Sequence, residues 1–133
     1  MSALQIFDRE QITMWYYPDK KIIHHQIHKY THGQVYRDAF MTGLEVMKKH
    51  GACKWLSDDR KNPVVAPEDR KWSLEVWHPL VVKAGWKYWA IVQPDRTIAK
   101  TRMERIAEMA ALSGLTIQIF DNVDDAMAWL EQQ

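Results

Sequence analysis

Five short runs of apolar and β-forming residues divide this sequence, and the stretches between the later runs have the periodicity of amphipathic helices. The turn residues Pro18 and Asp19 join the first two runs, which predicts an antiparallel hairpin. Each later run follows a helical segment, and this alternation is typical of a mostly parallel sheet. The order therefore predicts an α/β fold with an antiparallel edge. The five runs are ITMWYY (12–17), KIIHHQIH (21–28), ACKWL (52–56), WKYWAIVQ (86–93) and LTIQIF (115–120).

The segments between and after these runs predict four helices. Residues 33–50 repeat apolar groups at helical spacing, carry basic residues in the last turn and are followed by Gly51 as a stop signal. Residues 67–83 begin with a proline and two acids, and Pro79 is expected to kink or split this helix near His78. The remaining predicted helices are residues 98–113 and a C-terminal helix capped by Asp121 or Asn122.

Length and charge exclude several classes of protein. The 133 residues fit one domain, 1–133, and the 18 basic and 17 acidic side chains leave a net charge of +1. That balance argues against a nucleic-acid binder and against a polybasic membrane anchor. The single cysteine, Cys53, excludes an internal disulfide. The N-terminus lacks a secretory signal pattern, and no apolar run reaches the roughly 18 residues of a membrane span, so a cytoplasmic location is expected.

Four segments carry a resemblance to a known family: WYYPDKKIIHHQIH, KWLSDDRKN, GWKYWAIVQP and the terminal TIQIFDNVDDAMAWLEQ. Together they resemble the SpoIIAA-like, STAS-related family of small bacterial α/β domains over nearly the whole chain. The resemblance implies a single mixed sheet of about five strands with about four helices. Members of this family are largely of unassigned function. Related STAS domains act as anti-sigma-factor antagonists, as regulatory modules on transporters and sensors, or as binders of small or lipidic ligands.

The first candidate site is the charged loop that follows the predicted middle strand, 52–56. Ligands of open α/β sheets tend to bind beyond the carboxyl ends of strands, where this loop is expected. Its polar residues suit a cation, a cationic group or an anion. The alternative is a solvated turn, in which an exposed ion pair contributes less than about 1 kcal/mol. The candidate residues are Ser57, Asp58, Asp59 and Arg60.

Ser57 bears on whether the loop is a phosphorylation switch. The antagonist members of the resembled family use a phosphorylatable Ser in an Asp-Ser-Ser-Gly-type turn at the start of the following helix. Here Ser57 precedes two aspartates, and no Ser or Thr lies at the helix start near Pro67. A phosphate on Ser57 would face like charge, which argues against the same switch.

The second candidate site is aromatic, and a third candidate concerns the histidines. Trp72, Trp77 and Trp89 lie on or next to the predicted helix 67–83, where they form either core packing or an apolar groove for a lipidic ligand or a second subunit. His24 and His28 share a face of the predicted strand at a separation of roughly 13 Å, too far for one metal ion. No metal or other cofactor is therefore expected.

The chain lacks the motifs of nucleophilic and nucleotide-dependent enzymes, such as G-x-S-x-G, a P-loop and G-x-G-x-x-G. The sequence therefore favours a non-enzymatic regulatory or protein-interaction module that acts through loop 57–66. The alternative is a small-molecule or lipid-binding protein with an aromatic pocket near helix 67–83, and an enzyme that uses Asp58, Asp59 and Arg60 ranks third. The expected partner is an unknown protein or a small apolar ligand. A homodimer and peripheral membrane contact stay open.

Overall fold

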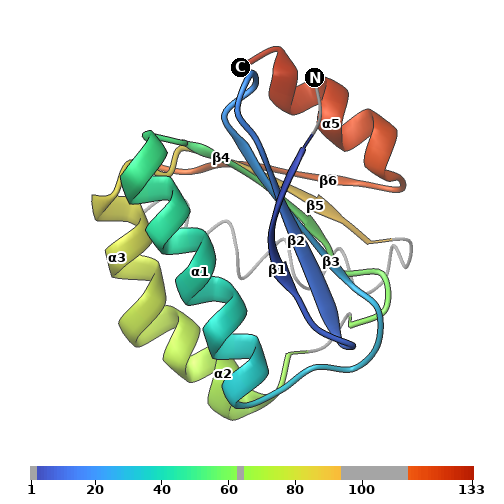
Figure 1. Cartoon of the computed structure of the whole chain (residues 1–133), viewed down its shortest axis with the longest axis vertical. Helices are drawn as coiled ribbons and strands as arrows, with labels where there is room; N and C mark the ends of the chain where they lie inside the picture. Colours follow the sequence, from blue (N-terminus) through green and yellow to red (C-terminus); the bar gives the residue numbers. More distant parts are fainter. Residues whose placement is uncertain (1–2, 63–64, 94–113) are drawn as a thin grey trace.

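The computed structural model describes residues 3–62, 65–93 and 114–133. These residues form one mixed sheet of six strands with helices packed against it. The strands lie in the order in which they occur in the sequence (Figure 1). The second strand is antiparallel to the first and to the third, and the third to sixth strands run parallel to one another. The strands are β1 (Leu4–Asp8), β2 (Ile12–Tyr17), β3 (Ile22–Ile27), β4 (Lys54–Asp58), β5 (Tyr88–Val92) and β6 (Thr116–Phe120).

The α/β class and the interior position of the middle strand are confirmed, but the expected number of strands is wrong. The described residues form a sheet of six strands rather than five, because β1 precedes the predicted hairpin. Its sequence, LQIFD, was not recognised because its register shifts between Gln5 and Phe7, and this β-bulge breaks the alternation that marks a strand. β4 pairs with β3 on one side and β5 on the other, as predicted for an interior strand.

The helices agree with the sequence pattern where the structure describes them. α1 (Gln34–His50) ends at Gly51, whose left-handed φ of 68° favours glycine. The run 67–83 is continuous and consists of α2 (Pro67–Trp72), the π-helical turn η1 (Ser73–Trp77) and α3 (His78–Lys83). The helix is not split at His78 but changes type there, since the wider turn ends at Trp77 and α3 begins at His78, one residue before the proline that lacks an N–H. The predicted helix 98–113 lies outside the described residues.

The last helix is α5 (Val123–Glu131), and Asn122 is its N-cap. The Asn122 side-chain oxygen accepts a hydrogen bond of 2.8 Å from the backbone N–H of Asp125. In Figure 1, α5 covers one face of the sheet, and α1 together with α2 and α3 covers the other. Residues on both faces of the parallel strands are therefore buried, which is usual for parallel sheets. On the α5 face the buried core is Ile22, Leu56, Ala90, Val92, Ala126 and Leu130.

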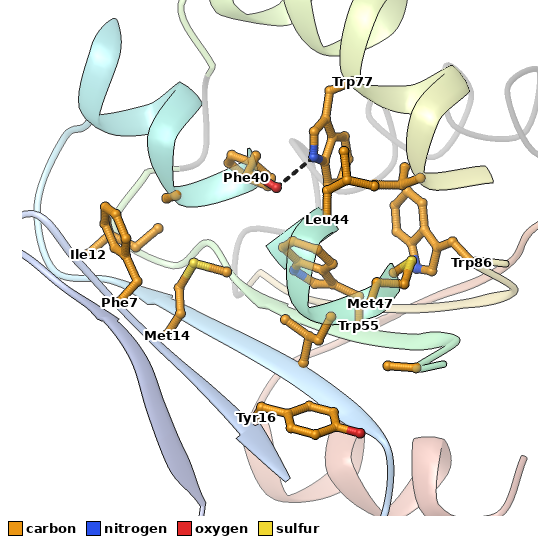
Figure 2. Packing of buried hydrophobic residues seen from close by; sticks show 14 of the residues in the cluster. Phe7, Ile12, Met14, Tyr16, Phe40, Leu44, Met47, Trp55, Trp77 and Trp86 are labelled. Atoms are coloured by element: carbon orange, nitrogen blue, oxygen red, sulfur yellow. Dashed lines mark hydrogen bonds between the residues drawn. The ribbon is translucent and has the colours of Figure 1, made fainter. Parts of the chain in front are cut away.

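Aromatic side chains fill the core on the α1 face (Figure 2). The Trp55 ring stacks on Phe40 at a centroid distance of 5.7 Å and meets Trp77 edge-on at 5.3 Å. Trp77 in turn contacts Trp86 at 5.4 Å, and its indole N–H donates to the backbone carbonyl of Phe40 at 2.7 Å. Gly43 of α1 makes room for this arrangement, since a Cβ there would lie 2.1 Å from the Trp55 ring.

Candidate functional site

The polar residues of the first candidate site lie at the carboxyl end of β4, as the sequence predicts, but the loop begins later than expected. Ser57 and Asp58 are the last residues of the strand rather than loop residues, because the ladder with β5 continues to the pair Asp58–Val92. Ser57, Asp58 and Asp59 are all buried, at 1%, 2% and 5% exposure. Arg60 and the following Lys61 are exposed.

The two adjacent carboxylates do not form a shared site. Trp55 of β4 packs in the α1-side core and Leu56 packs in the α5-side core, so alternate residues of this strand face opposite sides. Asp58 is bound to Arg60, whereas Asp59 is bound to His25. A cation held jointly by both carboxylates, one reading of the sequence, is not what this geometry favours.

His25 is the centre of a buried hydrogen-bonded chain that sequence analysis did not select. Its Nε2 lies 2.8 Å from Asp59 Oδ1, and its Nδ1 lies 3.0 Å from the indole nitrogen of Trp55. An indole N–H can only donate, so Nδ1 accepts, and the imidazole proton lies on Nε2 and points at Asp59. His25 is 1% exposed. Both of its ring nitrogens are occupied by partners within the chain.

Asp58 and Arg60 form a bidentate ion pair close to the hydrogen bonds of His25. Arg60 Nε and Nη2 donate to Asp58 Oδ1 and Oδ2 at 2.8 Å and 2.6 Å. The hydrogen bonds to Asp58 raise the pKa of the Arg60 guanidinium, so the guanidinium stays charged. The Asp58 side chain is 3% exposed and that of Arg60 is 41% exposed, so the guanidinium covers a buried carboxylate and shows its outer edge to solvent.

Backbone bonds hold the turn that follows. The Asp59 N–H donates to the Val92 carbonyl of β5 at 3.2 Å, and the Asn62 N–H donates to the Asp59 carbonyl at 3.0 Å. The Asn62 side-chain oxygen accepts from the Thr31 N–H at 3.2 Å, which ties the turn to the segment after β3. The turn from residue 59 to 62 is therefore anchored to β5 and to the segment after β3.

Ser57 is held by an indole rather than poised for chemistry. Its hydroxyl oxygen accepts a hydrogen bond of 2.8 Å from the Trp89 N–H on β5. Because Ser57 is buried in an interior strand, a kinase would have to open β4 to reach it. The structure thus gives a second reason, besides the neighbouring charges, against a phosphorylation switch at this residue.

The three tryptophans of the second candidate site do not line one surface. Trp77 belongs to the core, and Trp89 contacts Trp86 at a centroid distance of 5.0 Å as well as Ser57. Trp72 is half-buried and lies apart from them, edge-on to Tyr36 at 6.5 Å and under the Arg37 guanidinium at 5.6 Å.

His24 lies on the other face of β3, and burial sets its protonation state. Its Nδ1 is 3.1 Å from the Tyr17 hydroxyl and its ring lies 5.0 Å from Trp15, while Nε2 has no hydrogen-bond partner in the described part of the chain. Desolvation, together with the nearby His25, lowers the pKa of His24 from 6.5 to about 4. His28 bonds instead to Thr13 at 2.7 Å, so these two histidines serve different partners.

This pKa shift predicts a loss of stability in mild acid. Between pH 6.5 and about 4 the unfolded chain binds a proton at His24 that the folded chain does not. The free energy of unfolding should therefore fall by up to about 3 kcal/mol as the pH drops through this interval. Urea titrations at several pH values measure the slope. His24→Gln should flatten it and the exposed His32→Gln should not; equal slopes in both variants would contradict the assignment.

Sequence analysis missed His25 as a site residue, although one signal was present. A polar residue between Ile23 and Ile27 on the core-facing side of a strand needs a buried partner. The partner could not be named, because Asp59 lies 34 residues away and their contact depends on the β3–β4 register.

Asp69 was predicted only as an acidic residue that favours the start of a helix. Its carboxylate also accepts a hydrogen bond of 2.8 Å from the Gly33 N–H.

The fold and site thus define an α/β domain whose sheet edge is held together by internal polar pairs. Among the described residues, no group of three or more His, Cys, Asp or Glu side chains could hold a metal ion. No helix in the described part of the chain is long and apolar enough to cross a membrane. Comparisons with protein-family models, curated proteins and solved structures find no match.

Proposed function

We propose that this chain is a non-enzymatic regulatory or protein-interaction module with a STAS-like sheet, located in the cytoplasm. The observation that carries the proposal is the internal pairing at the carboxyl edge of β4. Asp58 is bound to Arg60, Asp59 to His25 and Ser57 to Trp89. Groups of the types that do acid–base or nucleophilic chemistry are present, but their hydrogen-bonding atoms are directed at one another.

The same pairing argues against hydrolytic chemistry at this edge. A serine nucleophile needs a neighbouring base that can take its proton. The candidate base is His25, which lies opposite Ser57 in the β3–β4 ladder. Its Nδ1, however, accepts a hydrogen bond from Trp55, and its Nε2 donates one to Asp59. The edge therefore suits a rigid support for a binding surface, since its side chains are already fixed before any partner arrives.

The surface that this support presents is the exposed part of the turn. Arg60 and Lys61 place cationic groups outside a rim whose acids are buried. Farther along the chain, η1 and α3 expose three large apolar side chains, Leu74, Val76 and Leu80, each more than 40% exposed. Exposed apolar side chains of this size are common at protein-interaction surfaces.

The alternative, an aromatic pocket for a small or lipidic ligand, has weaker support. Trp77 and Trp86 are 3% exposed and contact each other, so they fill the space they enclose. A hollow of about 290 Å³ does lie beyond α3, lined by Val82, Trp86 and Tyr88 among others. Its volume is at the lower limit of ordinary ligand pockets, which makes a long acyl chain a poor fit.

Charge reversal at the turn tests the proposal. Affinity capture from cells that express the protein natively, quantified by mass spectrometry, should recover a protein partner with the wild type. Lys61→Glu should reduce its recovery about tenfold, since the partner then meets like charge. Lys49→Glu, an equally exposed change on α1, should leave recovery unchanged. No partner, or equal recovery with both variants at matched thermal stability, would refute this role of the turn.

A further inference from the structure

The lateral edge of the sheet, formed by β1, carries a groove that the proposed function does not use. β1 is the edge strand and pairs only with β2 within the described sheet, so one row of its backbone N–H and C=O groups faces outward. A groove of about 700 Å³ lies between this strand and α1. Part of its lining is apolar, with Ile6 and Phe7 from β1 and Met41 from α1.

The groove is also acidic. Asp8 from β1 and Asp38 and Glu45 from α1 place three carboxylates along it, all on exposed residues. The cation that lines it, Arg9, is already engaged: its guanidinium lies 4.7 Å from the centre of the Phe7 ring and donates to the Asp8 backbone carbonyl at 2.9 Å. A second cation, Lys48 of α1, lies 3.7 Å from Glu45. Three carboxylates against these two cations still leave the local charge negative on a chain whose net charge is +1.

We infer that this groove docks an extended, cationic peptide segment of a partner protein, which adds a strand to β1. An edge strand supplies main-chain hydrogen bonds at the spacing of an extended peptide, and pockets beside it read alternate side chains. Lysine or arginine side chains of the added strand would reach Asp38 and Glu45 on α1, and intervening apolar side chains would cover Ile6 and Met41. This surface is separate from Arg60 and Lys61, so it can bind whether or not the turn does.

A second copy of this chain fits the groove less well. A β1 strand from another molecule, LQIFD, brings an aspartate and no lysine or arginine. Two such acidic edges repel each other, whereas a strand of opposite charge is attracted, which is how charge patterns select one partner over another.

Selection from a phage library of random octapeptides tests this inference. The wild type should enrich peptides with lysine or arginine at alternate positions, and the synthetic peptide should shift amide NMR signals of β1 and α1. The double variant Asp38→Lys, Glu45→Lys should weaken its binding at least about tenfold, since two attractions become repulsions. Glu75→Lys, an exposed reversal on η1, and Lys61→Glu should leave binding unchanged.

Three results would overturn the inference. One is no enrichment over an unrelated protein. Another is enrichment of acidic or purely apolar peptides, and a third is binding insensitive to the α1 charge reversal while the variant keeps its fold by circular dichroism. Concentration-dependent dimerisation in sedimentation that Asp8→Pro abolishes would instead assign this edge to self-association. Because Lys61→Glu is among the controls, failure here is distinguishable from failure of the proposed function of the turn.

Discussion

Replacing His25 with phenylalanine should lower the free energy of unfolding by about 3 to 5 kcal/mol, because a buried carboxylate and a buried indole N–H both lose their hydrogen-bond partner. The variant keeps an aromatic ring but removes both hydrogen bonds of the imidazole. It leaves the Asp59 carboxylate without its 2.8 Å contact to the imidazole and the Trp55 indole N–H without its acceptor. Chemical denaturation followed by tryptophan fluorescence measures the change.

Two further variants separate this effect from simple loss of packing. In the His25→Phe background, Asp59→Asn should recover part of the lost stability, because a buried neutral amide costs less than a buried carboxylate. A double-mutant cycle over these two positions should therefore give a coupling energy above about 1 kcal/mol. His32→Phe, at an exposed position, should change stability little. Additive effects at His25 and Asp59 would show that the pair does not hold the edge.

Replacing Gly43 with alanine should destabilise the protein by about 3 kcal/mol or more, the upper end of the usual cost of overpacking a core. The sign is the informative part, since Gly-to-Ala within a helix ordinarily stabilises by about 1 kcal/mol. Here the new methyl group would lie 2.1 Å from the Trp55 ring, far inside van der Waals contact. The ring cannot move freely, because it is stacked on Phe40 and bonded to His25.

The neighbouring residue provides the control for this substitution. Thr42→Ala, on the same helix, removes a hydroxyl that donates to the Asp38 carbonyl and should change stability by less than about 0.5 kcal/mol. Thermal unfolding of the two variants side by side measures the difference. If Gly43→Ala raises the melting temperature, then Trp55 does not pack against α1 as described.

Much of the fold could be predicted because local signals agreed with it. The hairpin of β2 and β3 followed from a turn between two β-rich runs, and α1 followed from helical spacing that ends at Gly51. β1 could not be predicted in the same way, because its bulge at Gln5–Phe7 removes the alternation and its strand character depends on pairing with β2. The end of β4 was placed too early for a similar reason. An aspartate such as Asp58 has a low local preference for strands. Pairing with β3 and β5 nevertheless extends β4 through this residue.

The candidate site was predicted by position but not by role. The rule that parallel strands present their functional ends at the carboxyl edge led to Asp58, Asp59 and Arg60. What these residues do depends on faces and registers: Asp58 and Asp59 turn to different partners, and His25 joins the site from a neighbouring strand. Such pairings lie beyond local sequence patterns, because they arise only when strands distant in sequence are aligned.

The proposed function depends most on hydrogen bonds within the chain that close the carboxyl end of β4, and the tautomer of His25 tests this closure directly. A long-range ¹H–¹⁵N correlation spectrum of histidine-labelled protein at neutral pH distinguishes the two ring nitrogens. The structure predicts a protonated Nε2, and an Nδ1 that is unprotonated and accepts from the Trp55 indole. A proton on Nδ1, or a ring that exchanges rapidly between tautomers, would contradict this pairing and reopen the edge to acid–base chemistry.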